Sequence, residues 1–120
     1  MSLTKVAVYG TLKQGHGNHR LLTDSKFLGK ASVKGRMYHL GGFPGVRLDE
    51  PGTVQVELYE VDNDTLRRLD RLEGYREGAA DNNFYTREIV ETDTEEHVSI
   101  YQISKDYTSD KRIIASGDWS

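Results

Sequence analysis

The sequence predicts an α+β fold, in which one main helix packs on a small, curved, barrel-like and mostly antiparallel sheet. Short β-branched runs separated by glycine-rich turns indicate several strands, and one segment alone has the period of a substantial amphipathic helix. Short strands curl or close to hide their edges, which favours the barrel-like form. With 120 residues, no repeat and no linker, we expect a single domain over residues 1–120.

Five strands are predicted from β-branched or alternating residues, at 5–9, 26–40, 53–61, 84–92 and 97–103. The second of these is expected to be long or bent, because Gly29 and Gly35 interrupt it. Residues 18–22 are expected to form a helical turn, and residues 41–45, with three glycines and a proline, a tight irregular loop. The acidic turn at residues 93–96, with three acidic residues of four, joins the last two strands, which indicates a hairpin.

An acidic residue, Glu73, falls on the apolar side of the helix predicted over residues 64–73. At about 100° per residue, Leu66, Leu69 and Glu73 share that side. Gly74 is expected to cap the helix, so the carboxylate lies in the last turn, where the helix dipole opposes negative charge. Burial and dipole should both raise the pKa of Glu73 above its usual value of about 4.3. Because groups tuned in this way are frequent at catalytic sites, Glu73 is a candidate acid/base.

Two features of this helix stay open at the level of sequence. Either Asp62 or Asp64 is expected to be its N-cap. The carboxylate of Glu73 also has an ordinary alternative, since it can reach water or pair with an arginine such as Arg76 or Arg87.

The first predicted strand ends in a glycine turn, within Tyr9-Gly10-Thr11-Leu12. Glycine there allows successive backbone N–H groups to point at a cavity, where they suit a carboxylate, a phosphate or a developing oxyanion. A Tyr-Gly transition is equally common as a plain turn, so this segment alone supports both interpretations. Its spacing matches neither a phosphate-binding loop nor a dinucleotide-binding fingerprint.

Composition excludes several classes of protein. The net charge of −3 and the lack of any lysine or arginine run argue against a nucleic-acid partner. Absence of cysteine removes disulfides, thiolate nucleophiles and cysteine-ligated zinc, and agrees with a reducing compartment. No apolar run approaches membrane-spanning length and the first residues lack the core of a signal peptide, so we expect a cytoplasmic location and no membrane partner.

Other candidate sites are weaker. His16 and His19 stand three residues apart without an evident third ligand, so a solvated loop is favoured over a metal site, and no metal is predicted. Serine catalysis lacks a GxSxG elbow, and the acidic run at 91–96 is best explained as a solvated hairpin tip. The sole tryptophan, Trp119, is expected to dock back on the body of the protein.

Four segments occur together in a characteristic order: Tyr9-Gly10-Thr11-Leu12, Leu69-Asp70-Arg71-Leu72-Glu73-Gly74, Tyr85-Thr86-Arg87 and Gly117-Asp118-Trp119. In this combination the chain resembles the gamma-glutamylcyclotransferase-like superfamily, and within it the gamma-glutamylamine cyclotransferase, AIG2-like and YtfP-like proteins. The resemblance spans essentially the whole chain.

This resemblance implies a barrel-like α+β fold with a cavity for a gamma-glutamyl group. Its acid/base falls on Glu73, and the backbone that holds the glutamyl carboxylate and carbonyl falls on Tyr9, Gly10, Thr11 and Leu12. Its strand tyrosine falls on Tyr85, with Arg87 behind it, and a second cavity-facing tyrosine falls on Tyr101. For Tyr85 and Tyr101, ordinary core or cross-strand packing is an equal expectation.

The implied activity is cyclisation of a gamma-glutamyl amine or amide to 5-oxoproline with release of the amine. The small-molecule substrate supplies its own nucleophile, so no cofactor is expected, and the identity of the amine and the oligomeric state stay open. A non-enzymatic small-ligand-binding protein with the same cavity is the alternative. An interaction module is a third, if side chains such as Val56 and Phe43 fill the cavity. Val56 stands where the family often has glycine, and its side chain is expected to narrow or reshape the cavity.

Overall fold

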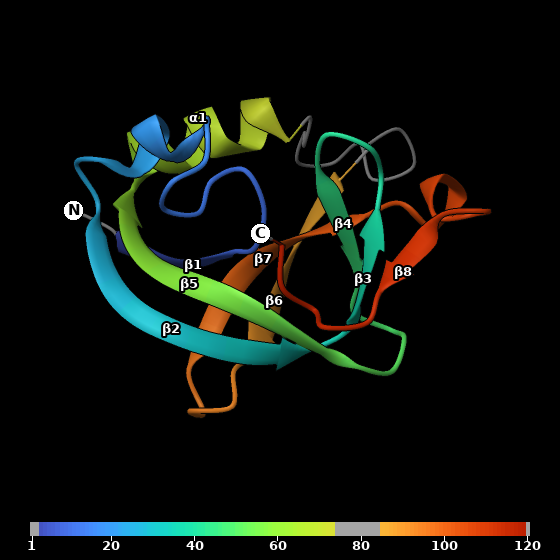
Figure 1. The fold of residues 1–120 in the computed structure, drawn as a ribbon. Coiled ribbons are helices and arrows are strands. Elements are labelled where there is room, and N and C mark those ends of the chain that lie inside the picture. The colour runs from blue at the N-terminus through green and yellow to red at the C-terminus, as the bar shows by residue number, and fades with distance from the viewer. Residues whose placement is uncertain (1–2, 74–84, 120) are drawn as a thin grey trace.

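The computed structural model describes residues 3–73 and 85–119. A curved five-stranded sheet has the order β2-β5-β1-β7-β6, and a three-stranded sheet has the order β4-β3-β8 (Figure 1). The strands are β1 (Leu3–Val8), β2 (Lys26–Lys34), β3 (Arg36–His39), β4 (Pro44–Arg47), β5 (Thr53–Asp62), β6 (Tyr85–Glu91), β7 (His97–Ile103) and β8 (Arg112–Ile114). The helices are the 3-10 turns η1 (His19–Leu22) and η3 (Lys105–Tyr107) and the α-helix α1 (Asn63–Leu72).

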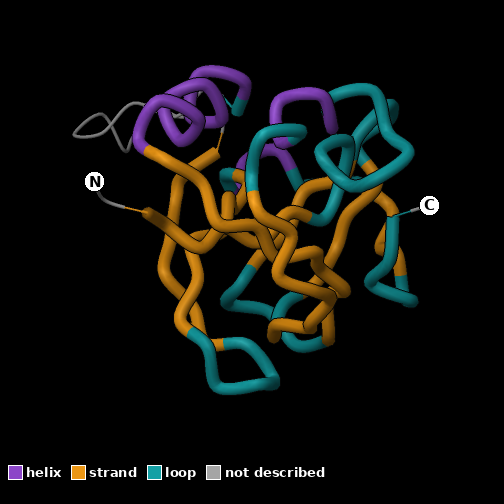
Figure 2. Tube along the Cα trace, turned by 90° about the vertical axis from the view of Figure 1, so that its left-hand side faces the viewer, coloured by secondary structure: helices purple, strands orange, loops and turns teal. Residues whose placement is uncertain are grey.

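Among the strand pairs of the described residues, β1 and β7 run parallel and the others antiparallel. The helical segments gather on one side of the strands (Figure 2). These features confirm the predicted fold class: a curved, mostly antiparallel sheet with one main helix. No helix within 3–73 or 85–119 is long and apolar enough to cross a membrane.

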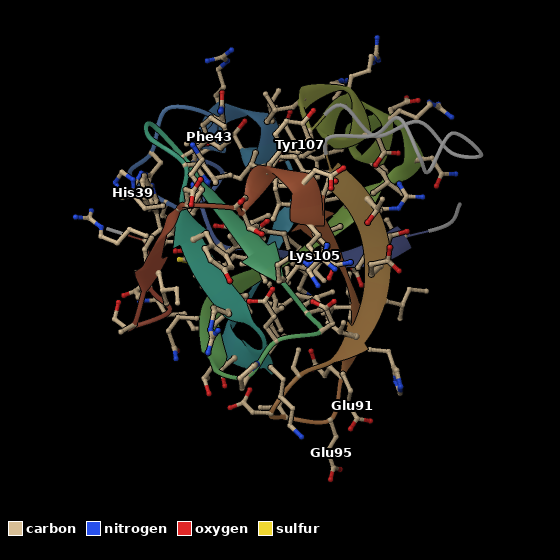
Figure 3. The ribbon with its side chains drawn as sticks, turned by 90° about the vertical axis from the view of Figure 1, so that its right-hand side faces the viewer. His39, Phe43, Glu91, Glu95, Lys105 and Tyr107 are labelled. Carbon is tan, nitrogen blue, oxygen red and sulfur yellow. The ribbon has the colours of Figure 1, made fainter. Side chains whose placement is uncertain are left out.

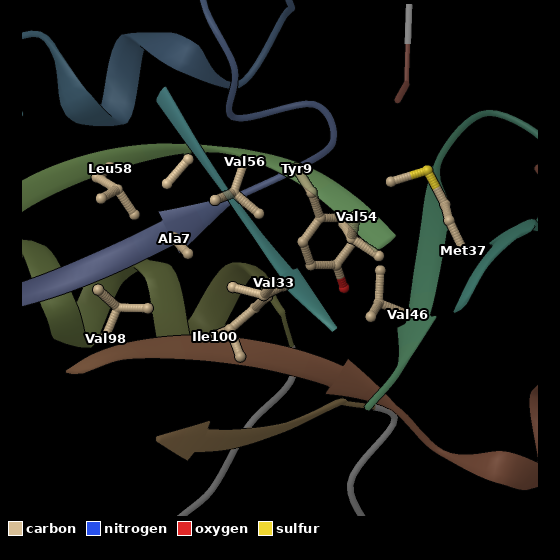
Figure 4. Packing of buried hydrophobic residues seen from close by; sticks show 11 residues of the cluster. Ala7, Tyr9, Val33, Met37, Val46, Val54, Val56, Leu58, Val98 and Ile100 are labelled. Atoms are coloured by element: carbon tan, nitrogen blue, oxygen red, sulfur yellow. The ribbon is translucent and has the colours of Figure 1, made fainter. Parts of the chain in front are cut away.

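Strand β1 lies between two hydrophobic clusters because successive side chains of a strand point to opposite faces. Ala7 joins the cluster between the five-stranded sheet and β3 and β4, which includes Val56 and Met37 (Figure 4). Val6 and Val8 join a second cluster, formed with the helical side of the molecule. The end of β1 is therefore fixed from both faces, which gives the loop after it a rigid base.

The predicted strand at 26–40 is bent, as expected, and the bend divides it between two sheets. It separates at Gly35 into β2 and β3, and a register shift between Phe27 and Gly29 adds a bulge to β2. A Cβ at Gly35 would lie 3.1 Å from the carbonyl oxygen of Arg47, so the chain crosses closely there.

The N-cap of α1 is Asp62, whose side chain accepts the amide of Thr65 at 2.8 Å. Asp64, the other candidate, pairs instead with Arg67 on the exposed face. Leu69 is fully buried and anchors the helix to the second cluster. The hairpin β6–β7 and the turn η1 also agree with prediction.

The prediction of a loop over residues 41–45 is wrong for its last two residues. Pro44 and Gly45 begin β4, because proline is tolerated as the first residue of a strand. Gly45 serves packing, since a Cβ there would lie 2.8 Å from the Cβ of Ile103. Strand β8 is not among the predicted elements; it has three residues, too few for a period-2 pattern.

Candidate active site

A cavity of about 480 Å³ lies where the end of β1, the loop before β4, the C-terminal end of α1 and strands β6 and β7 meet. Its volume is within the range of small-molecule sites. All seven residues predicted for the site line it: Tyr9, Gly10, Thr11, Leu12, Glu73, Tyr85 and Tyr101. The fold thus brings together segments that are up to 92 residues apart in sequence.

Glu73 follows the last residue of α1, and its backbone N–H donates to the carbonyl of Leu69 at 3.0 Å. The carboxyl group is partly buried and forms no hydrogen bond or ion pair with any described residue. Burial raises its pKa from the ordinary 4.5 to about 7. The direction of this pKa shift and its main cause, burial, are those expected from the sequence. The expected cap, Gly74, lies outside the described residues.

The loop after β1 lines the cavity, and its carbonyl and amide groups differ in their hydrogen bonding to the described residues. The carbonyls of Gly10 and Thr11 accept the amides of Lys13 and Asn18, each at 3.0 Å, and the Asn18 side-chain amide donates to the Thr11 hydroxyl oxygen at 2.8 Å. The amides of Gly10, Thr11 and Leu12 donate to no group in the described part of the chain. They are therefore available to an anion or an oxyanion. Asn18, which also lines the cavity, is not among the predicted residues.

Tyr85 and Pro44 fix one wall of the cavity beside Gly10. The Tyr85 hydroxyl donates to the Pro44 carbonyl at 2.8 Å, and a Cβ at Gly10 would lie 2.9 Å from two ring carbons of Pro44. Glycine is thus required where the loop and β4 approach each other. Burial, followed by the nearby charge of Glu73, raises the pKa of Tyr85. Both expectations for Tyr85 hold, because it lines the cavity and is itself packed.

Tyr101 belongs to a network centred on Asp70. Its hydroxyl donates to Asp70 at 2.6 Å, and Arg87 donates to the two oxygens of the same carboxylate at 2.7 and 2.6 Å. Of the two arginines expected as alternative partners of Glu73, Arg87 forms its ion pair with Asp70 and none with Glu73, and Arg76 lies outside the described residues. Asp70 is a residue that the sequence analysis missed, although it stands three positions before Glu73.

Tyr9 closes the inner end of the cavity. Its hydroxyl donates to the carbonyl of Tyr101 at 2.6 Å, and its side chain is buried. Burial, and then the neighbouring charges of Tyr85 and Glu73, raise its pKa well above the usual value. Like the other two cavity tyrosines, Tyr9 stays protonated at neutral pH.

The loop between β1 and η1 is held in place by a buried carboxylate, that of Glu57. This side chain accepts the amide of Gln14 at 2.9 Å and the Tyr59 hydroxyl at 3.1 Å. Lys13 adds a second anchor, since its ammonium donates to the carbonyl of Trp119 at 2.5 Å. Trp119 also packs against the core, which confirms its expected docking. Glu57 was not among the candidates from sequence.

Two other expectations are decided by burial. Val56 does not line the cavity; it is 2% exposed and packs in the hydrophobic core, so the expectation that it narrows the cavity is wrong. Phe43 does line the cavity but leaves it open.

His19 has a ring nitrogen 3.0 Å from the carbonyl of Leu12, and the described residues hold no cluster of three or more potential metal ligands.

Fold and cavity together define a small α+β protein with a partly open cavity, lined by one carboxyl group that has no hydrogen-bond or ion-pair partner among the described residues. Residues 6–120 match the family model described as "Gamma-glutamyl cyclotransferase, AIG2-like", and the chain belongs to this family.

Three known proteins illustrate the relationship. The gamma-glutamylcyclotransferase family protein YtfP of Escherichia coli K12 is 34% identical over 117 residues, covering 96% of this chain and 95% of its own. Gamma-L-glutamyl-butirosin B gamma-glutamyl cyclotransferase of Niallia circulans is 43% identical over 70 residues, covering 57% of this chain and 44% of its own. The crystal structure of PH0828 from Pyrococcus horikoshii has 29% identity and a TM-score of 0.73, covering 96% of this chain and 88% of its own.

Proposed function

We propose that this protein is a cyclotransferase, which converts a gamma-glutamyl amine or amide to 5-oxoproline and a free amine. One observation carries the proposal. A carboxyl group with a pKa of about 7, that of Glu73, lines the same cavity as the amides of Gly10, Thr11 and Leu12, and neither has a partner in residues 3–73 and 85–119. The relative from Niallia circulans, named as a gamma-glutamyl cyclotransferase, supports the same reaction class.

The substrate carries its own nucleophile. Its α-amine attacks the gamma-carbonyl carbon, a nitrogen–carbon bond closes the five-membered ring, and the bond to the leaving amine breaks. Intramolecular attack of a well-oriented group can reach effective molarities of about 10⁵ to 10⁸ M. The main task of the cavity is therefore to hold the glutamyl chain folded.

Glu73 moves the proton in this scheme. As a carboxylate it takes a proton from the attacking amine, and as a carboxylic acid it gives the proton to the leaving nitrogen. A pKa of about 7 suits both steps near neutral pH. The three cavity tyrosines have raised pKa values and stay neutral, so Glu73 is the group of the described lining that titrates near neutrality.

The amides after β1 stabilise the developing charge. The gamma-carbonyl oxygen becomes negative in the tetrahedral intermediate, and preorganised N–H donors stabilise such an oxyanion in a site with little water. Tyr85 and Pro44 fix the position of Gly10, so the donors do not have to reorganise during the reaction. The buried rings of Tyr9 and Tyr101 supply apolar walls against the methylene groups of the glutamyl chain.

Substitution of Glu73 by glutamine tests the proposal, because it keeps the shape of the side chain and removes the proton carrier. Release of 5-oxoproline from a panel of gamma-glutamyl amides should fall by about 10²- to 10⁴-fold in E73Q. The matched control is E88Q, a change on the exposed face of β6, which should keep the wild-type rate. Wild-type turnover in a folded E73Q protein would exclude the mechanism. Binding of 5-oxoproline or glutamate without any turnover would favour the non-enzymatic alternative.

A further inference from the structure

The opening of the cavity is apolar. Among its described lining residues, Gly42, Phe43 and Leu72 are exposed, and the two side chains are 37% and 41% accessible. The deeper lining, from β1, β6 and β7, is buried. Large apolar side chains that stay accessible at the mouth of a ligand cavity commonly provide contact area for the ligand.

Each of these two side chains is adjacent to an anchored residue. Phe43 precedes Pro44, whose carbonyl accepts the Tyr85 hydroxyl, and its own carbonyl accepts the amide of Leu40 at 3.0 Å across the turn between β3 and β4. Figure 3 shows Phe43 at the end of these strands. Leu72 is the last residue of α1 and precedes Glu73. The apolar mouth is therefore built on fixed backbone.

The charges near the mouth do not favour a cationic ligand. In the described lining, Glu73 is the one ionisable carboxyl group, and the proposed reaction uses it for proton transfer. A ligand with a second positive charge beyond the reacting nitrogen would thus meet the apolar side chains of Phe43 and Leu72 and no further carboxylate of the described lining.

The direction of the substrate follows from the proton transfer. If the glutamyl group occupies the buried part beside the amides of Gly10, Thr11 and Leu12, the leaving nitrogen lies at Glu73. Its substituent then points past Leu72 and Phe43 to the opening. We propose that the amine released by this enzyme carries an uncharged, apolar substituent, alkyl or aryl, which Phe43 and Leu72 contact. This inference rests on the proposed cyclotransferase function and names its substrate class.

A pair of substrates of equal length tests the inference. Gamma-glutamyl hexylamide ends in a methyl group, and gamma-glutamyl cadaverine ends in an ammonium group at the same position. We expect kcat/KM to be about tenfold or more higher for the hexylamide, which is the discrimination that one methylene contact in an apolar pocket typically gives. Release of each amine and of 5-oxoproline is measured in parallel.

Variants show which residues cause the preference. F43A and L72A should each lower the ratio of the two kcat/KM values by several fold, mainly through a slower reaction of the hexylamide. The control is I113A, a change of an apolar side chain that is 45% exposed on β8 and does not line the cavity. Because Phe43 and Leu72 are also accessible, their truncation should leave the fold intact, and a melting curve checks this.

Three results are distinguishable. A preference for the hexylamide that F43A and L72A reduce and I113A leaves unchanged supports the inference. Equal turnover, preference for the cadaverine derivative, or a preference insensitive to F43A and L72A overturns the inference and leaves the cyclotransferase function standing. No turnover of any gamma-glutamyl amide overturns the proposed function, and the inference with it.

Discussion

Two carboxyl groups stand three residues apart at the C-terminal end of α1, Asp70 in the helix and Glu73 directly after it, and have opposite surroundings. Asp70 accepts three hydrogen bonds, two from Arg87 and one from Tyr101, and its side chain is 18% exposed. Glu73 accepts none from the described residues, and burial raises its pKa to about 7. One helix end thus holds a carboxylate that is fully engaged in structural contacts beside one that has no partner among the described residues and to which we assign proton transfer.

The two are connected through the fold. Asp70 ties the end of α1 to β6 through Arg87 and to β7 through Tyr101. These strands also carry the cavity-lining residues Tyr85 and Tyr101, so Asp70 links the end of α1, where Glu73 follows, to the wall that they form. A reactive group needs such support, because small displacements cost a large part of the rate.

The largest expected effect concerns the pH dependence of stability in E73Q. The folded-state pKa of Glu73, about 7, lies above its ordinary value of 4.5, so the folded protein binds this proton more tightly than the unfolded chain. The resulting stability is fully present below about pH 4.5 and is lost as the pH rises through about 7. The free energy of unfolding of E73Q relative to wild type should therefore rise by about 3 kcal/mol at most between these limits. Urea unfolding at several pH values measures it. Parallel pH profiles for the two proteins would contradict the raised pKa.

A smaller effect is expected for D70N, which removes the charge that Arg87 and Tyr101 contact. Loss of charged hydrogen bonds in a partly buried site should lower the free energy of unfolding by about 1.5 to 3 kcal/mol. Activity should fall too, because α1 loses its link to β6 and β7. D64N is the matched control: its carboxylate is 71% exposed in a surface pair with Arg67, and it should change stability little. Equal stability of D70N and D64N would break the comparison.

The smallest effect is expected for D62A at the other end of α1. It removes the side-chain cap of the Thr65 amide, so the melting temperature should fall by a few degrees. Turnover at 25 °C should stay unchanged, because the links of Asp70 still hold the end of the helix beside Glu73. A loss of turnover as large as in D70N would show that general helix stability, rather than the Asp70 network, positions Glu73.

Local patterns in the sequence predicted the two parts of the site. The position of Glu73 follows from the 3.6-residue period, and the loop at Gly10 follows from a β-branched run that ends in glycine. Both are properties of neighbouring residues. Asp70 could not be found in this way, because its partners Arg87 and Tyr101 are 17 and 31 residues away. Three-dimensional contacts between elements leave no periodic signal in either segment.

The three-stranded sheet was the least predictable part of the fold. Gly45 suggested a turn, whereas it lies in β4 and is required for close packing against Ile103 of β7. Val56 suggested an altered cavity, but its side chain is buried in the hydrophobic core and does not line the cavity. In both cases the residue type was evident from the sequence, but its role depended on which residues the fold places beside it.

Titration of the Glu73 side-chain carboxyl carbon by NMR is the most direct test of the account, with E73Q used to assign the resonance. The account predicts a midpoint near pH 7, well above the ordinary 4.5, in the wild-type protein without ligand. A midpoint close to 4.5 would show that this carboxyl group is solvated like a surface glutamate, and would contradict its proposed role as the proton carrier of the cavity.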